Sequence, residues 1–133
     1  MVEPSRLAGI PLFAGLAETE LATIAAAASE VEVAEGQLVA TEGDFGHALY
    51  AIESGTAEVR SEGALLRTLG PGDPFGEIAV IASGRRTASV VTTSPMRLIA
   101  LFKRDVWALE RQTPELAKRL RAVLDKHRAA DGS

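Results

Sequence analysis

Closely spaced glycines divide the middle of the chain into short segments, and this spacing restricts the possible folds more than any other feature. The segments between and after them alternate apolar and polar residues, as in EVEVAE, QLVATE, HALYAIES, TAEVRSE, ALLRTLG, TASVVTT and MRLIALF. Strands of about five residues with a turn roughly every 8–12 residues are typical of a compact antiparallel barrel or sandwich. The glycines concerned are Gly36, Gly43, Gly46, Gly55, Gly63, Gly70, Gly72, Gly76 and Gly84.

Helical patterns flank this region on both sides. Residues Ala17–Val31 place apolar side chains at helical spacing, and Thr19 is suited to cap that helix. The segment Leu7–Leu16 is interrupted by a proline and two glycines, which predicts a short turn or helix. Lys103–Thr113 predicts a further helix, and Pro114 is suited to the first turn of the one after it.

The order of these elements predicts an α+β fold that is mainly β, an antiparallel jelly-roll-like β-barrel with an N-terminal helix and two C-terminal helices. We expect a single domain over residues 1–133, with an N-terminal helical bundle at about 5–30, the barrel at about 31–102 and the last helices at about 103–129. Trp107 is expected to be a core or helix-packing anchor rather than a residue that stacks on a ligand. The basic side chains of the last helix are expected to form its solvated side: Lys118, Arg119, Arg121, Lys126 and Arg128.

Composition excludes several classes of function. The chain has no cysteine, which rules out disulfides, thiolate metal sites and cysteine nucleophiles. A net charge of −4 disfavours direct nucleic acid binding, since duplex affinity rests on basic contacts to phosphates. The sequence contains no apolar run of about 18 residues and no secretory signal, so we expect a cytoplasmic protein without a membrane span.

The stretch GEIAVIASGRRTASV, residues 76–90, has the sharpest chemistry in the chain. Glu77 is an acceptor-only carboxylate suited to a hydroxyl group, and Arg86 is a permanent planar cation suited to a phosphate. If the residues after Gly76 form a short helical turn, the N–H groups of Ile78 and Ala79 create an anion site. A phosphorylated ribose is the simplest ligand that uses all three groups. No nucleophile, base or metal cluster accompanies them, so a binding pocket is favoured over a catalytic site.

This stretch resembles the phosphate-binding cassette of the cyclic nucleotide-binding domains. The family signature is F-G-E, a short loop and then R-[ST]-A, and Phe75-Gly76-Glu77 and Arg86-Thr87-Ala88 match it. The upstream segment EGDFGHALYAIESGTAEV resembles the hairpin that precedes the cassette in that family, except that His47 stands where an acidic residue is usual. The resemblance extends from about Leu12 to about Arg128, which is nearly the whole chain.

The resemblance implies a role for each matched residue. Glu77 would accept a hydrogen bond from the ribose 2′-hydroxyl, Arg86 would pair with the cyclic phosphate, and Thr87 would donate to the phosphate or the base. Val59 and Leu69 would wall the base, and a residue near Leu124–Arg128, first of all His127, would cap it. The complete set of ligand-binding residues implied in this way is Val59, Leu69, Phe75, Gly76, Glu77, Ile78, Ala79, Arg86, Thr87, Ala88, Leu124, His127 and Arg128.

The leading interpretation is a cAMP or cGMP sensor, without a metal and without enzymatic activity, that relays ligand occupancy through its last helix. An alternative is the sensory half of a Crp/Fnr-type transcription regulator, since the 133 residues leave no room for a DNA-binding part. A second alternative is a degenerate module that only dimerises or scaffolds, but such a module would be expected to lose Glu77 or Arg86, and both are present. For these two residues themselves, the alternative to ligand binding is a structural ion pair at a turn. The effector is not indicated, and a leucine-rich last helix is suited to pairing with a second copy of the chain.

Overall fold

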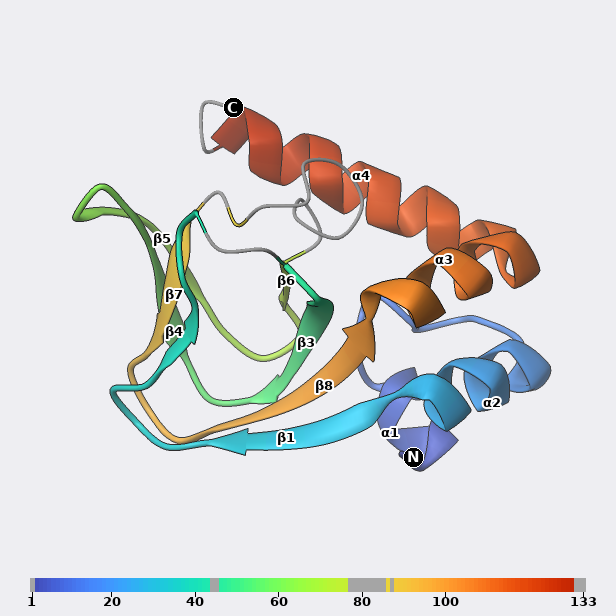
Figure 1. Cartoon of the computed structure of the whole chain (residues 1–133). Helices are drawn as coiled ribbons and strands as arrows, with labels where there is room; N and C mark the ends of the chain where they lie inside the picture. The colour runs from blue at the N-terminus through green and yellow to red at the C-terminus, as the bar shows by residue number, and fades with distance from the viewer. Residues whose placement is uncertain (1, 44–45, 77–85, 87, 131–133) are drawn as a thin grey trace.

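The computed structural model describes residues 2–43, 46–76, 86 and 88–130, with side chains described as far as Lys126. Two four-stranded antiparallel sheets face each other (Figure 1). The strand order is β1-β8-β3-β6 in the first sheet and β2-β7-β4-β5 in the second. This arrangement confirms the predicted jelly-roll-like β fold with helices at both ends of the chain.

The predicted strands form at the expected places. The strands are β1 (Ser29–Val33), β2 (Leu38–Ala40), β3 (Ala48–Ser54), β4 (Ala57–Ser61), β5 (Ala64–Leu69), β6 (Pro74–Phe75), β7 (Ser89–Thr92) and β8 (Met96–Phe102). The helices are α1 (Pro4–Ala8), α2 (Glu18–Ala27), α3 (Lys103–Gln112) and α4 (Pro114–Ala130). In Figure 1, α1, α2 and α3 gather near one end of the first sheet, and α4 runs above β6 and β3.

The central strands β3 and β8 are buried on both faces and separate two apolar clusters. Because successive side chains of a strand point to opposite faces, Leu49 and Ala51 face the helices while Ile52 faces the second sheet. The helix-side cluster joins these strands to buried residues of all four helices. The inter-sheet cluster consists mainly of residues from the two facing sheets: Ala40, Ile52, Ala57, Val59, Leu69, Phe75, Ala88, Val90, Met96 and Leu98.

Helix α2 ends earlier than its periodicity predicts. The helix stops at Ala27, Ala28 has an extended backbone with ψ of 149°, and Ser29 already pairs with Ala100 of β8. Pairing with β8 overrides the helical pattern, because it places Val31 opposite Leu98 at the edge of the inter-sheet cluster. The expected cap at Thr19 is also wrong: helix α2 is capped by the Glu20 carboxylate, which accepts a hydrogen bond from the Ala17 N–H at 3.0 Å.

One further expectation needs correction. Trp107 does not pack in the core: it is half exposed, and the Nζ of Lys103 lies 5.1 Å from its ring centroid. The core face of α3 is formed instead by Val106 and Leu109, which lie one position before and two positions after Trp107. Pro74 and Phe75, which belong to none of the strands predicted from the sequence, form β6 by pairing with β3.

Arg119 is not a solvated side chain of the last helix. Its Nη1 donates hydrogen bonds to the carbonyl oxygens of Leu12 at 3.1 Å and Ala14 at 2.6 Å. These bonds satisfy carbonyl groups of an irregular segment and fasten α4 to the turn between α1 and α2. The buried Leu116 and Leu120 hold the same part of α4 in the helix-side cluster.

Ion pairs connect α1 to the outer surface of the first sheet. Arg6 donates from Nε to Glu53 of β3 at 2.9 Å and from Nη1 to Glu30 of β1 at 3.1 Å. Arg97 of β8 pairs with the same Glu30 at 3.1 Å and with Glu32. The hydrogen bond from Arg6 lowers the pKa of Glu53 below its ordinary value, against the opposing effect of burial.

We expect Arg6→Gln to lower the stability of the fold at neutral pH and to weaken its dependence on acid. Because the pKa of Glu53 is lowered in the folded state, its ion pair stabilises the fold above the ordinary carboxyl pKa. That stabilisation disappears as the pH falls through the lowered value. Urea unfolding at neutral pH and at about pH 3 should show the gap between variant and wild type shrinking in acid. Arg104→Gln, on the exposed side of α3, is the control, and a gap that stays constant with pH would contradict the assignment.

We also expect Gly55→Ala to destabilise the protein more than Gly36→Ala. Both glycines have a positive φ, of 95° and 79°, so alanine is strained at either position by about 1–2 kcal/mol. A Cβ at Gly55 would also overlap the carbonyl oxygen of Pro95 and lie 2.8 Å from the Cα of Met96, whereas Gly36 has nothing within 4 Å. The excess at Gly55 should be about 1–3 kcal/mol in chemical unfolding. Equal losses would show that the β3–β4 turn is not tightly packed on the start of β8.

Candidate functional site

Arg86 lies where three distant parts of the chain meet. Its carbonyl oxygen accepts a hydrogen bond from the N–H of Gly43 at 2.9 Å. Its guanidinium donates from Nη2 to the carbonyl oxygen of Ala48 at 2.9 Å and from Nη1 to that of Gly76 at 3.2 Å. Both of these acceptors are neutral, so the contacts orient the guanidinium without cancelling its charge.

Gly76 allows this close approach for two reasons. Its φ is +88°, a left-handed conformation that favours glycine. A Cβ at this position would overlap Nη1 of Arg86 and lie 3.0 Å from the carbonyl oxygen of Ala48. The glycine that begins the predicted cassette is therefore also the residue that makes room for its arginine.

The aromatic residues beside Arg86 form a stacked pair. Phe75 is buried and packs on Tyr50 with ring centroids 5.0 Å apart and an interplanar angle of 23°. The Cζ of Arg86 lies 5.8 Å from the centroid of the Tyr50 ring. The structure thus brings Phe75, Gly76 and Arg86, all expected from the sequence, into one cluster with Tyr50.

The residues expected to wall the base lie in the adjoining inter-sheet cluster. Val59 of β4 and Leu69 of β5 are buried, and Ala88 precedes β7 in the same cluster. Leu124, expected near the cap, is buried on α4 and is not part of that cluster. His127 and Arg128 belong to α4, but their side chains lie outside the described residues, as do Glu77, Ile78, Ala79 and Thr87.

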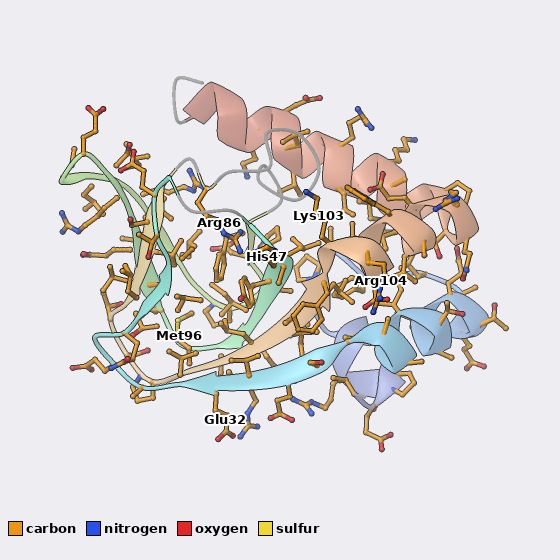
Figure 2. The ribbon with its side chains drawn as sticks, viewed as in Figure 1. Glu32, His47, Arg86, Met96, Lys103 and Arg104 are labelled. Atoms are coloured by element: carbon orange, nitrogen blue, oxygen red, sulfur yellow. The ribbon has the colours of Figure 1, made fainter. Side chains whose placement is uncertain are left out.

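A cavity of about 220 Å³ opens beside the guanidinium. His47 is exposed in the loop before β3, as expected, and Figure 2 shows it beside Arg86 and Lys103. Arg86 and His47 carry the basic groups of the cavity, and its described lining contains no carboxylate, so the local chemistry suits an anion. The lining residues are Val39, Ala40, Thr41, His47, Ala48, Tyr50, Arg86 and Phe102.

Glu42 fixes the loop whose next residue, Gly43, donates its N–H to the carbonyl oxygen of Arg86. Its carboxylate accepts hydrogen bonds from the hydroxyl of Ser61 at 2.6 Å and from the N–H of Glu62 at 3.0 Å. These bonds lower the pKa of Glu42 below its ordinary value. The Glu42 N–H donates to the hydroxyl of Ser89 at 2.9 Å, so the loop is tied to both β4 and β7. Alternation of apolar and polar residues gives no sign of this role, because each partner lies far away in sequence.

Arg67 of β5 also escapes the sequence analysis. It pairs directly with Val59 in the β4–β5 ladder, so the two side chains project from the same face of the second sheet. Arg67 is half buried, and Leu69 lies two residues later on the same face. A guanidinium therefore stands beside the two expected base walls. The sequence does indicate this position, because Arg67 alternates with Leu65 and Leu69 along the segment ALLRTLG.

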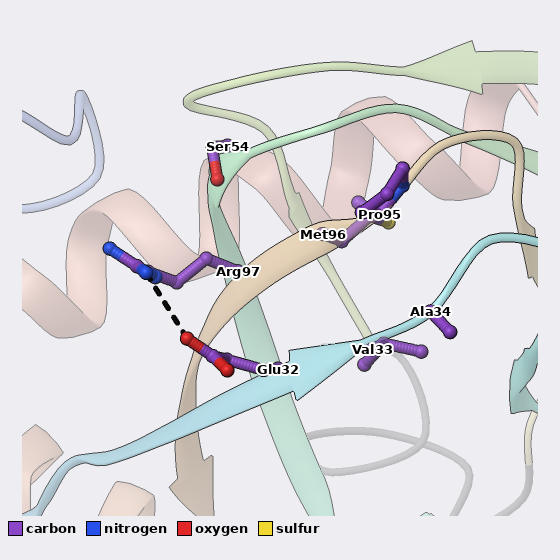
Figure 3. Close-up of a pocket in the computed structure, with 7 residues that line it drawn as sticks. All are labelled: Glu32, Val33, Ala34, Ser54, Pro95, Met96 and Arg97. Atoms are coloured by element: carbon purple, nitrogen blue, oxygen red, sulfur yellow. Dashed lines mark hydrogen bonds and ion pairs between the residues drawn. The ribbon is translucent and has the colours of Figure 1, made fainter.

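A second hollow lies away from this cluster. It has a volume of about 420 Å³ and is lined by Glu32, Val33, Ala34, Ser54, Pro95, Met96 and Arg97 (Figure 3). The ion pair between Arg97 and Glu32 spans it, with a distance of 3.1 Å between the nitrogen and the oxygen. It contains none of the residues expected to bind a ligand.

The described residues contain no cluster of three His, Asp or Glu side chains that could hold a metal ion. Within the same residues, no helix is both long and apolar enough to cross a membrane. The described part of the site contains a guanidinium, an imidazole, aromatic rings and apolar side chains.

Comparison with known proteins gives consistent results. Residues 30–113 match the family model of the cyclic nucleotide-binding domain. The chain is 36% identical over 129 residues to the cyclic AMP receptor protein of Thermus thermophilus, covering 92% of this chain and 60% of the relative. It is 33% identical over 102 residues to a cAMP-dependent protein kinase regulatory subunit of Yarrowia lipolytica, covering 77% of this chain and 25% of that protein.

Solved structures agree with these matches. The regulatory domain of Toxoplasma gondii PKA, crystallised with cAMP, superposes with a TM-score of 0.72 at 30% identity over 80% of this chain and 42% of that one. The chain therefore spans between a quarter and about three fifths of the length of these relatives. The family model covers most of the chain and includes both the hairpin before the cassette and the cassette itself. The chain belongs to the cyclic nucleotide-binding domain family.

Proposed function

We propose that this chain, acting as one unit over residues 1–133, binds a cyclic nucleotide and passes its occupancy to an effector through α4. The observation that carries the proposal is the placement of Arg86. Two backbone carbonyls hold its guanidinium beside a basic cavity and next to the glycine that begins the cassette. A planar cation fixed in this way is suited to two oxygens of a phosphate.

The remaining cassette residues complete the proposed site. Glu77 would accept from the ribose 2′-hydroxyl, and the N–H groups of Ile78 and Ala79 and the hydroxyl of Thr87 would donate to the phosphate. Val59 and Leu69 would wall the base, and α4 would cap it through Leu124, His127 or Arg128. The arginine and the backbone N–H donors suit the anionic phosphate of a cyclic nucleotide, and the carboxylate suits its neutral ribose hydroxyl.

The base is adenine or guanine, and two observations favour different choices. The names of the relatives favour cAMP, since they include a cyclic AMP receptor protein and a cAMP-dependent kinase subunit. The inward position of Arg67 favours cGMP, because guanine offers two adjacent acceptors, O6 and N7, to a guanidinium. Both ligands therefore belong in the first binding experiment, with 5′-AMP as the acyclic control.

The relay through α4 rests on the contacts of that helix. Arg119 binds it to the turn between α1 and α2, and Leu116 and Leu120 bury it among the helices. A ligand shifts the balance between two positions of α4 only if it makes contacts with the helix in one position that it does not make in the other. The turn at Leu12 and Ala14 would then sense the position of α4.

The effector defines the alternatives. A sensory part of a transcription regulator is compatible with the similarity to the cyclic AMP receptor protein. In that role the chain would bind its ligand without itself contacting nucleic acid. A scaffold that has lost its ligand would show no binding of either nucleotide, and pairing of two copies through α4 would suit any of these roles. We propose a regulatory rather than enzymatic role, and the cytoplasmic location stays a prediction.

We expect Arg86→Ala to weaken binding of the preferred cyclic nucleotide by at least about tenfold in calorimetry. A hydrogen bond to a charged group contributes about 1.5–3 kcal/mol, and about 1.4 kcal/mol corresponds to one decade of affinity. Arg104→Ala removes the same charge from an exposed position and is the control for long-range electrostatics. Wild-type affinity in Arg86→Ala, with the thermal unfolding of both variants unchanged, would exclude Arg86 from the phosphate site.

We expect Glu77→Ala to weaken binding and, more specifically, to reduce the preference for the ribose form over the 2′-deoxyribose form of the same nucleotide. The variant loses the acceptor for the 2′-hydroxyl, so the ribose form loses the most affinity. Competition titrations with the two forms against wild type and Glu77→Ala measure the preference directly. Glu35→Ala, at an exposed position, serves as the control. An undiminished preference would show that the carboxylate does not contact the ribose.

A further inference from the structure

Tyr50 is the described side chain through which β3 contacts the Arg86 guanidinium. The Cζ of Arg86 lies 5.8 Å from the ring centroid, within the range at which a cation is attracted to an aromatic face. The same ring is stacked on the buried Phe75 at 5.0 Å. The contact therefore joins the arginine at the end of the cassette to the residue before its first glycine.

The strand fixes the direction of Tyr50. Tyr50 pairs with Ala100 of β8 on one side and with Phe75 of β6 on the other. Tyr50 lies between Ala48 and Ile52 on the face of β3 that is turned toward the second sheet. The small side chain of Ala100 leaves space for the ring, and stacking on Phe75 limits its rotation. The ring is thereby held by strands β6 and β8.

The backbone contacts of Arg86 and its contact with the ring have different effects. The carbonyl oxygens of Ala48 and Gly76 accept from Nη2 and Nη1 and so fix the two ends of the guanidinium. A ring within cation–π distance restricts movement of the whole group toward the cavity that Tyr50 and Arg86 both line. The two carbonyl oxygens and the ring are all uncharged, so these three contacts act by orienting the guanidinium rather than by forming an ion pair with it.

We propose that Tyr50 is a positioning residue, which holds the Arg86 guanidinium in place for the phosphate of the bound nucleotide. The inference rests on the proposed function, because it assigns a role within the same site. It differs from a plain packing role in one testable respect. A packing role would weaken ligand binding whether or not Arg86 is present, whereas a positioning role acts only through Arg86.

The test is a double-mutant cycle on the full chain, read by calorimetry with whichever of cAMP and cGMP binds wild type more tightly. We expect Tyr50→Leu to weaken binding by about three- to tenfold in wild type and by less than about twofold in the Arg86→Ala background. Tyr50→Phe keeps an aromatic face and should stay within about twofold of wild type. Trp107→Leu removes an aromatic ring that also lies within cation–π distance of a basic side chain, Lys103, but on the exposed side of α3 and outside this cavity; it is the matched control and should leave the affinity unchanged.

A ligand-free readout supplements the cycle. In a proton–nitrogen spectrum, the Nε–H signal of Arg86 should carry a ring-current shift that Tyr50→Phe keeps and Tyr50→Leu removes. Because this readout needs no ligand, it also tests the contact if Tyr50→Leu has reduced thermal stability. Equal losses of affinity in both backgrounds, or an Arg86 signal that Tyr50→Leu leaves in place, would overturn the role of Tyr50 alone. Absence of binding by wild type would overturn the proposed function itself.

Discussion

The antiparallel pair of β3 and β8 is the interaction on which the rest of the structure depends. Leu49 opposite Leu101 and Ala51 opposite Ile99 present one apolar face, against which the helices pack. Ile52 opposite Leu98 presents the other face, which closes the space between the sheets. A slip of one residue would exchange the two faces, so the register of this pair places the helices and the ligand side of the domain at once.

The candidate site follows from that register. With β3 fixed, Ala48 offers its carbonyl oxygen and Tyr50 its ring on the inner side, and β6 brings Phe75 and Gly76 against them. The guanidinium of Arg86 then meets two neutral acceptors and an aromatic ring, rather than a carboxylate, at these contacts. These contacts orient the guanidinium at the edge of the cavity.

The helix side of the same strand pair connects the site to the remainder of the domain. Helix α4 combines buried leucines with Arg119, whose bonds reach the turn between α1 and α2. Helix α1 is in turn tied to the outer face of the first sheet by Arg6 and its carboxylate partners. Static contacts therefore connect α4 to the turn between α1 and α2, and α1 to the first sheet, which is compatible with the relay proposed above.

The sequence by itself determined the local and periodic features. Glycine spacing with alternating residues predicted the long strands, Pro114 marked the start of the last helix, and the Phe-Gly-Glu and Arg-Thr-Ala pair indicated the family. These features are legible because each depends on neighbours in the chain, on backbone conformation or on a contiguous motif. The motif predicts a glycine at position 76, but only the fold shows that a Cβ there would overlap the guanidinium of Arg86.

Only the tertiary structure decided where local preference yields to long-range contact. Helix α2 ends at Ala27 because the residues from Ser29 onward pair with β8 as strand β1, and β6 forms because it pairs with β3. Trp107 is exposed because the face of α3 that meets the core is set by Val106 and Leu109. Long-range contacts likewise determine what three polar or aromatic side chains do. Glu42 binds Ser61, 19 residues away, and Arg119 binds Leu12, 107 residues away. Tyr50 contacts Arg86 and the Phe75 ring of a neighbouring strand. Such pairings leave no periodic trace in the sequence, because they arise only when packing of the apolar faces brings distant segments together.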